Sequence, residues 1–224
     1  MKHLIPLCSL ALLLAACAGA PPPANWKMNA VSLLEHAQQR WLEGDSQSAE
    51  LALEKMRADI AQSGRVDLLA RAELAACASR IAGLDFAACA AYAPLAVDAG
   101  PGEKAYARFL SGDWAGLDAK SLPAHYAGLI GAKNDADANQ AARAIKGPLP
   151  RLIAAGLLLQ GGRADPVTQG VAVDTASERG WRRPLLAWLE VQRQRALAGG
   201  EADAAAQLQR RIDLVLNQTK ANKP

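Results

Sequence analysis

The sequence predicts an all-α fold, and three observations support this prediction. Alanine, which has a high helix propensity and a low strand propensity, occurs throughout the chain. Apolar residues recur at the spacing of one helix face, and no alternating apolar–polar run is long enough for a strand. Glycine and proline interrupt these segments at short intervals, as at the turns of hairpins. We therefore expect an array or an irregular bundle of antiparallel helical hairpins.

The first residues are typical of a secretory signal peptide. Lys2 gives a basic start to an apolar run from Leu4 to Ala16. This run is shorter than the roughly 20 residues that a helix needs to span a bilayer. A short apolar run behind a basic residue, ending in small residues, indicates a signal peptide that is later removed. We assign residues 1–16 to this signal.

The end of the signal carries a family resemblance. Leu14-Ala15-Ala16-Cys17 resembles the lipobox of bacterial lipoproteins, which implies cleavage before Cys17. The resemblance also implies a covalent diacylglyceryl group and an N-acyl chain such as palmitate on Cys17, together a durable membrane anchor. Ala18 stands where an Asp would imply retention at the inner membrane, so the expected location is the outer membrane, facing the periplasm. The alternative is an ordinary signal peptide cleaved near Ala16-Cys17-Ala18.

The rest of the chain divides into three parts. Residues 17–28 are expected to be a lipidated, proline-rich tether, since Pro21 to Pro23 favour an extended backbone. Residues 29–220 form the helical hairpin domain, and residues 221–224 form a short tail.

Periodic apolar stripes locate the first helices of this domain. Stripes over 30–41, 49–60 and 66–81 predict three helices, each followed by a glycine at a turn. Asp45 is placed to cap the second. A fourth, short helix is expected over 86–93, ended by the proline that follows.

Seven further helices follow. We expect them near 102–111, 123–132, 136–146, 151–160, 166–179, 184–198 and 202–217. Pro123, Pro166 and Pro184 stand where a first-turn proline belongs, and Asp165 is a suitable cap before Pro166.

Candidate hairpins begin near residues 30, 66, 122, 150 and 184, at spacings of 36, 56, 28 and 34 residues. Two of these spacings are close to the period of tetratricopeptide arrays, one is shorter, and the longest holds an irregular extra piece. The first hairpin resembles a tetratricopeptide unit at Ala37, Gly44, Ala49 and Leu53. It departs from that family at Leu33, Arg40 and Met56, where a Trp, an aromatic residue and an Ala are preferred. A tetratricopeptide-like array and an irregular bundle both remain open.

The LAAC motif recurs within the domain, at Cys77, and a similar FAAC ends at Cys89. The two cysteines are placed evenly about Gly83, so in a helical hairpin they would face each other about 9 Å from its apex. The alanines around them allow the close approach that a disulfide requires. We expect a Cys77–Cys89 disulfide in an oxidising compartment, and two buried thiols are the alternative.

No pattern indicates catalysis. HExxH, CxxC, GxSxG and phosphate-loop motifs are all missing from the sequence. His36 falls off its apolar stripe, and His125 is best explained as a histidine at the edge of the core. We expect no enzyme activity, no metal site and no cofactor besides the lipid. The formal net charge of +3 is too small to indicate nucleic-acid binding.

One local cluster is a candidate binding surface. Arg179, Arg182 and Arg183 flank Trp181 and could meet a carboxylate, a phosphate or an aromatic group. The alternative is a solvated junction with the tryptophan packed beneath it. Stacked hairpins would also present a concave groove.

The sequence therefore predicts a lipoprotein that binds or scaffolds another envelope protein or peptide. The alternatives are an enzyme or enzyme regulator that acts on cell-wall material, and a purely structural lipoprotein.

Overall fold

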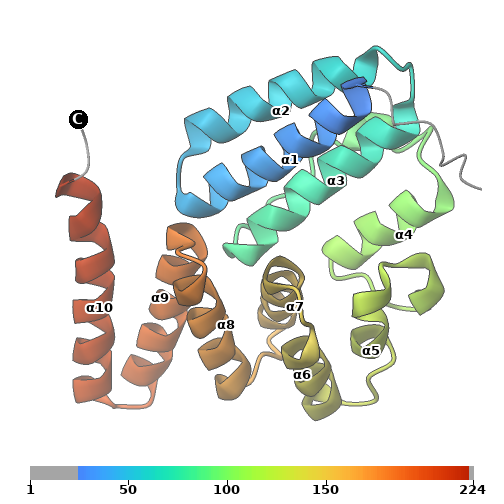
Figure 1. Cartoon of the computed structure of the whole chain (residues 1–224). Helices are drawn as coiled ribbons and strands as arrows, with labels where there is room; N and C mark the ends of the chain where they lie inside the picture. The colour runs from blue at the N-terminus through green and yellow to red at the C-terminus, as the bar shows by residue number, and fades with distance from the viewer. Residues whose placement is uncertain (1–24, 222–224) are drawn as a thin grey trace, which may run out of the picture.

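The structure is a computed structural model that describes residues 25–221, with side chains described for 25–217. Within this range it contains ten α-helices, three short 3₁₀ helices and no strand (Figure 1). The predicted all-α fold is confirmed. The predicted signal peptide, Cys17 and most of the tether lie outside the described residues.

The first three helices pack side by side and form one arm of the molecule (Figure 1). They are α1 (Asn25–Glu43), α2 (Ser46–Ala61) and α3 (Val66–Ala82). Helix α1 begins inside the stretch that the sequence assigned to the tether. The predicted cap of α2 is confirmed, because Asp45 Oδ1 accepts a hydrogen bond from the backbone N–H of Ser48 at 3.0 Å.

Residues 83–92, here called the strap, follow α3. The helix expected over 86–93 is wrong, because residues 85–89 have no regular secondary structure. Leu84 adopts a left-handed conformation with φ of 63°, which turns the chain away from the α3 axis. The Asp85 side chain then accepts the backbone N–H of Ala87 at 3.1 Å and holds a local turn in place of a helix.

Short elements connect the strap to the second half of the chain. They are η1 (Ala93–Leu95), α4 (Pro101–Leu110), η2 (Ala119–Ser121), η3 (Ala124–Tyr126) and α5 (Ala127–Ile130). The helix expected over 123–132 is therefore two short pieces. Pro123 lies at the N-terminal boundary of η3, and α5 ends at Ile130 with Gly131 as its C-terminal cap.

The remaining helices follow one another with short turns (Figure 1). They are α6 (Asp135–Ala144), α7 (Pro148–Gln160), α8 (Pro166–Glu178), α9 (Arg182–Ala198) and α10 (Ala202–Ala221). As predicted, Asp165 caps α8, since its Oδ1 accepts the backbone N–H of Thr168 at 2.6 Å. None of the described helices is both long and apolar enough to cross a bilayer.

The core centres on the crossing of α3 with α7, and α9 packs against the C-terminal end of α3. Gly156 of α7 lies so close to α3 that an added Cβ would be 2.5 Å from the carbonyl oxygen of Ile81. Trp188 of α9 is fully buried, and its indole N–H donates to the carbonyl oxygen of Ala82 at 3.3 Å. A smaller apolar cluster around Met56 fills the space between the first three helices.

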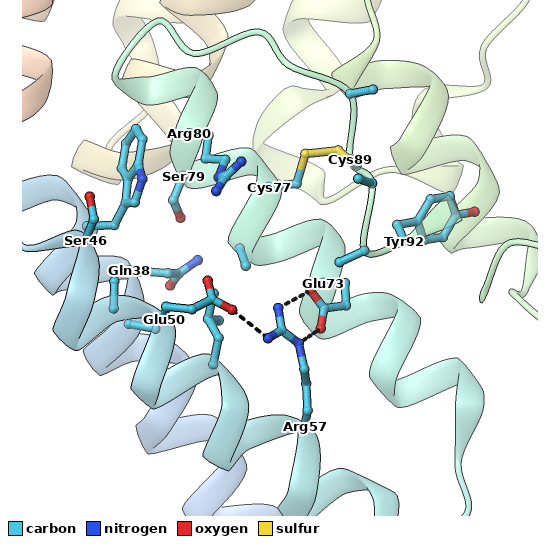
Figure 2. A pocket seen from close by; sticks show the side chains of 18 residues that line it. Gln38, Ser46, Glu50, Arg57, Glu73, Cys77, Ser79, Arg80, Cys89 and Tyr92 are labelled. Atoms are coloured by element: carbon cyan, nitrogen blue, oxygen red, sulfur yellow. Dashed lines mark hydrogen bonds and ion pairs between the residues drawn. A yellow bond between two sulfur atoms is a disulfide. The ribbon is translucent and has the colours of Figure 1, made fainter. Parts of the chain in front are cut away.

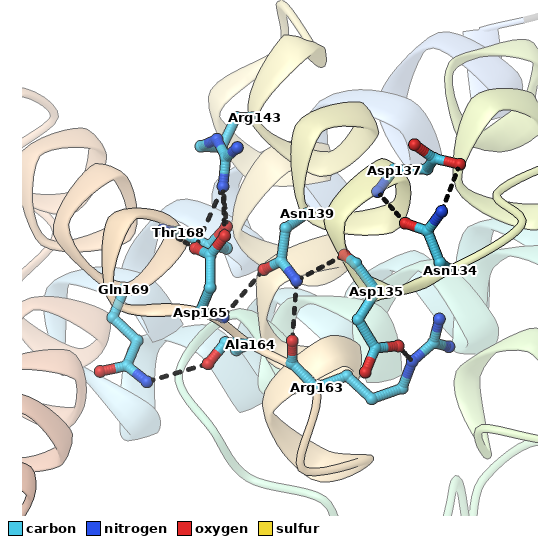
Figure 3. Close-up of polar contacts among 10 residues, drawn as sticks. All are labelled: Asn134, Asp135, Asp137, Asn139, Arg143, Arg163, Ala164, Asp165, Thr168 and Gln169. Carbon is cyan, nitrogen blue, oxygen red and sulfur yellow. Dashed lines mark hydrogen bonds and ion pairs between the residues drawn. The ribbon is translucent and has the colours of Figure 1, made fainter.

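A buried polar network fastens α6 to the turn between α7 and α8 (Figure 3). The Asn139 side-chain amide donates to the carbonyl oxygens of Asp135 at 2.8 Å and Arg163 at 2.7 Å. Its oxygen accepts the backbone N–H of Asp165 at 2.9 Å. Because Asn139 is only 1% exposed, these three bonds replace the water that its amide loses on folding.

Candidate functional site

A pocket of about 440 Å³ lies between α1, α2, α3 and the strap (Figure 2). We call it the strap pocket. The polar and aromatic side chains that line it include Gln38, Trp41, Glu50, Arg57, Glu73 and Arg80. Each comes from a helix of the first arm, and the strap closes the opposite side. The volume falls in the range of ordinary ligand sites.

A disulfide fixes the strap to α3. Cys77 and Cys89 are bonded, with their Cα atoms 5.6 Å apart (Figure 2). Both residues line the pocket. The sequence paired these cysteines across a helical hairpin, but only Cys77 lies on a helix. Tyr92 anchors the far end of the strap and is 8% exposed, and this burial, with the nearby charge of Glu103, raises the pKa of its hydroxyl.

The strap presents backbone rather than bulky side chains to the pocket. Ala88, Ala90 and Ala91 line it, and each is exposed. In the described part of the chain, the backbone N–H groups of Phe86, Ala88 and Cys89 donate to no protein acceptor. Ala88 and Cys89, which line the pocket, therefore offer backbone donors in a segment without regular secondary structure.

The opposite wall carries two acidic and two basic side chains. The Arg57 guanidinium donates from Nε to Glu73 Oε1 at 2.6 Å and from Nη1 to Glu50 Oε1 at 2.8 Å (Figure 2). The hydrogen bonds to Glu73 are the main reason that the pKa of Arg57 is raised. Two carboxylates thus share one cation. Arg80, near the strap, lies 4.0 Å from the carboxylate of Asp85.

Sequence reasoning did not single out Gln38, Arg57, Glu73 or Arg80. One signal for Glu73 was available, because this charged residue interrupts the apolar stripe of 66–81 one helical turn before Cys77. Its side chain is buried and needs the partner that Arg57 supplies.

The sequence-predicted binding surface is a junction within the fold. Its residues are Arg179, Trp181, Arg182 and Arg183. Trp181 is 4% exposed, and its indole N–H donates to Gln39 Oε1 of α1 at 3.0 Å. The Arg179 guanidinium stacks over the Trp181 ring at 5.3 Å. Packing between α1 and α9 covers the indole, as expected from the alternative of a junction with the tryptophan packed beneath it.

The other two arginines extend the same junction. Arg183 donates from Nε to the carbonyl oxygen of Trp41 at 2.7 Å, and its guanidinium stacks over the Trp41 indole ring, 4.5 Å from the ring centroid. Burial is the main cause that lowers the pKa of Arg183. The Arg182 side chain lies against Gly44 in the turn between α1 and α2. These contacts fix α9 to the helices that form the strap pocket.

The two histidines within the described residues lie apart from this pocket. His36 is exposed on α1. His125 packs edge-on against the Tyr126 ring at 4.1 Å, and partial burial lowers its pKa. Among the described residues, no group of three or more His, Cys, Asp and Glu side chains is arranged to hold a metal ion.

Fold and pocket together define an all-α protein with a disulfide-closed pocket of mixed polarity. In comparisons with known proteins, no family model, no curated protein and no solved structure matches this chain. Its function is therefore argued from its own residues.

Proposed function

We propose that this chain is a bacterial outer-membrane lipoprotein whose helical domain binds an extended segment of another envelope protein in the strap pocket. The lipobox-like Leu14-Ala15-Ala16-Cys17 supports the anchor. The strap supports the binding role. A scaffold of hairpins on a lipid tether would hold a partner close to the periplasmic face of the membrane.

One observation carries the choice of an extended peptide. On the strap side the pocket is lined by Ala88 and Cys89, whose backbone N–H groups have no acceptor within the described chain. A peptide laid along the strap can supply carbonyl oxygens to them, as in strand addition at a sheet edge. The alanine side chains of the strap leave room for this approach. The Glu50 carboxylate, on a side chain that is 53% exposed, favours a segment that carries a Lys or Arg.

The anchor is tested by Cys17→Ser. We expect this variant to remain unprocessed by the lipoprotein peptidase and to lack the acyl chains. The measurements are metabolic labelling with a palmitate analogue and fractionation of membranes after a carbonate wash. Normal processing of Cys17→Ser, with full retention in the washed membranes, would refute the anchor.

The binding role is tested by site-specific photo-crosslinking in cells. A photoreactive amino acid at Ala90, exposed on the strap, should give a discrete adduct with one protein. The matched control is the same substitution at Ala206, exposed on α10. Glu50→Lys should reduce the Ala90 adduct several-fold. The proposal fails if Ala90 and Ala206 give the same products, or if Glu50→Lys leaves the adduct unchanged.

A further inference from the structure

A second hollow lies on the other side of α3. It has a volume of about 420 Å³ and is enclosed by α3, α4, η3 and α7. Its apolar lining includes Leu74, Ala78, Tyr106, Tyr126, Leu149 and Ile153. Gln38 is the one lining residue that it shares with the strap pocket. The Gln38 side-chain amide donates a hydrogen bond to the carbonyl oxygen of Ala75 at 2.9 Å. This second hollow is therefore a separate site.

This hollow adjoins another at η3. His125 and Pro150 line both it and a neighbouring hollow of about 440 Å³. The walls of the neighbouring hollow include Gly128, Ala144 and Ile145. We call the two together the His125 groove. Burial raises the pKa of Tyr106 to about 12 and raises that of Tyr126 well above its usual value, so both rings are neutral parts of the wall.

Polar groups mark the two ends of the groove. At one end Arg71 donates from both Nε and Nη2 to a single oxygen of Glu103, at 2.9 and 2.6 Å. At the other end stands Lys146, which is exposed and makes no ion pair with any described side chain. One end is thus neutralised, and the other carries an uncompensated positive charge.

The walls of this groove disfavour a peptide. Helices α3 and α7 form much of it, and their backbone groups are already bonded within the helices. A peptide would lose hydrogen bonds to water and find few partners in return. A hydrocarbon chain has no hydrogen bonds to water to lose, and each methylene that becomes fully buried tightens binding by about fourfold.

We infer that the His125 groove binds a long-chain fatty acid, with the alkyl chain along the apolar walls and the carboxylate beside Lys146. The inference does not depend on the proposed role of the strap pocket, because the two sites have different walls. An acyl chain matches the apolar lining, and a single anionic head matches the one lysine at the groove end.

The test uses the full-length protein and a palmitate analogue with a photoreactive diazirine near its methyl end. We expect saturable labelling that maps to peptides of the groove, and competition by palmitate but not by hexadecanol. Lys146→Glu should weaken binding, so that the concentration of the analogue at half-maximal labelling rises at least tenfold. The matched control, Lys133→Glu, changes another exposed lysine outside the groove and should alter it less than twofold.

A second variant tests the groove without changing its charge. Gly128→Leu adds a side chain to the neighbouring hollow, where a Cβ would make an ordinary 3.5 Å contact with Ala141. It should abolish labelling while the circular-dichroism spectrum stays helical. The inference is overturned if labelling survives both Lys146→Glu and Gly128→Leu, if it maps outside the groove, or if hexadecanol competes as well as palmitate.

Discussion

Removal of the Cys77–Cys89 disulfide should lower the stability of the domain by about 3 kcal/mol. The perturbation is the double variant Cys77→Ala and Cys89→Ala, which deletes the cross-link between α3 and the strap. Alanine is used because Cys77 is only 7% exposed, and a serine there would bury an extra hydroxyl.

The magnitude follows from the size of the loop that the bond closes. The two cysteines are 12 residues apart, and in the chain-entropy model a closed loop of this length restricts the unfolded chain by about 3 kcal/mol at 25 °C. The two sulfur atoms also lose apolar contacts, which adds up to about 1 kcal/mol. Reduced wild-type protein keeps those contacts and lacks the bond, so it separates the two effects.

The assay is equilibrium unfolding in urea, followed by circular dichroism, for the oxidised, reduced and double-alanine proteins. We expect the oxidised protein to be the most stable, and the other two to agree within about 1 kcal/mol. A difference below about 1 kcal/mol between oxidised and reduced protein would refute the reasoning. Alkylation of two thiols in native protein that was isolated without reductant would refute the bond itself.

Three further predictions test the packing and the charges. Asn139→Leu leaves the carbonyl oxygen of Arg163 and the backbone N–H of Asp165 without this partner and should cost about 3 kcal/mol in urea unfolding. A loss below about 1 kcal/mol would show that water replaces the amide. Gly156→Ala should destabilise the protein by about 1–3 kcal/mol, because the added Cβ would collide with α3. Gly170→Ala, whose added Cβ has no other atom within 4 Å, should stabilise it by about 0.5–1 kcal/mol. Equal effects of the two substitutions would contradict the close crossing of α3 and α7. Hydrogen bonds from Arg193 hold the pKa of Glu190 at about 2, below its usual 4.5. They therefore contribute at most about 0.5 kcal/mol to the free energy of unfolding above pH 4.5, and this contribution is lost as the pH falls toward 2. Glu190→Gln should remove that part of the acid destabilisation, and an unchanged pH profile of unfolding would contradict it.

The helices could largely be located from the sequence, because local signals set their ends. Asp45 and Asp165 accept the N–H groups expected of caps, and glycines follow most of the predicted stripes. The prediction was wrong at residues 86–93, where alanine propensity favoured a helix. There the left-handed Leu84 and the tie from Cys89 to α3 outweigh a small intrinsic preference.

The candidate sites could not be located in this way, because their residues are distant in the chain. Gln38, Arg57 and Cys89 meet only after α1, α2 and the strap have packed on α3. The cluster around Trp181 was a conspicuous sequence feature, yet Trp181 pairs with Gln39, 142 residues away. Burial depends on such long-range contacts, and no periodic pattern reports them.

Helix α10 lies at one edge of the molecule and packs mainly against α9 (Figure 1). Its outer face exposes Leu214, which is 63% accessible. With one principal neighbour, this helix can open while the crossing of α3 and α7 stays closed, so its amide hydrogens should exchange with solvent well before those of the core. A label placed near the C-terminus would therefore report the loosening of the edge, and would give too low a value for the stability of the whole domain.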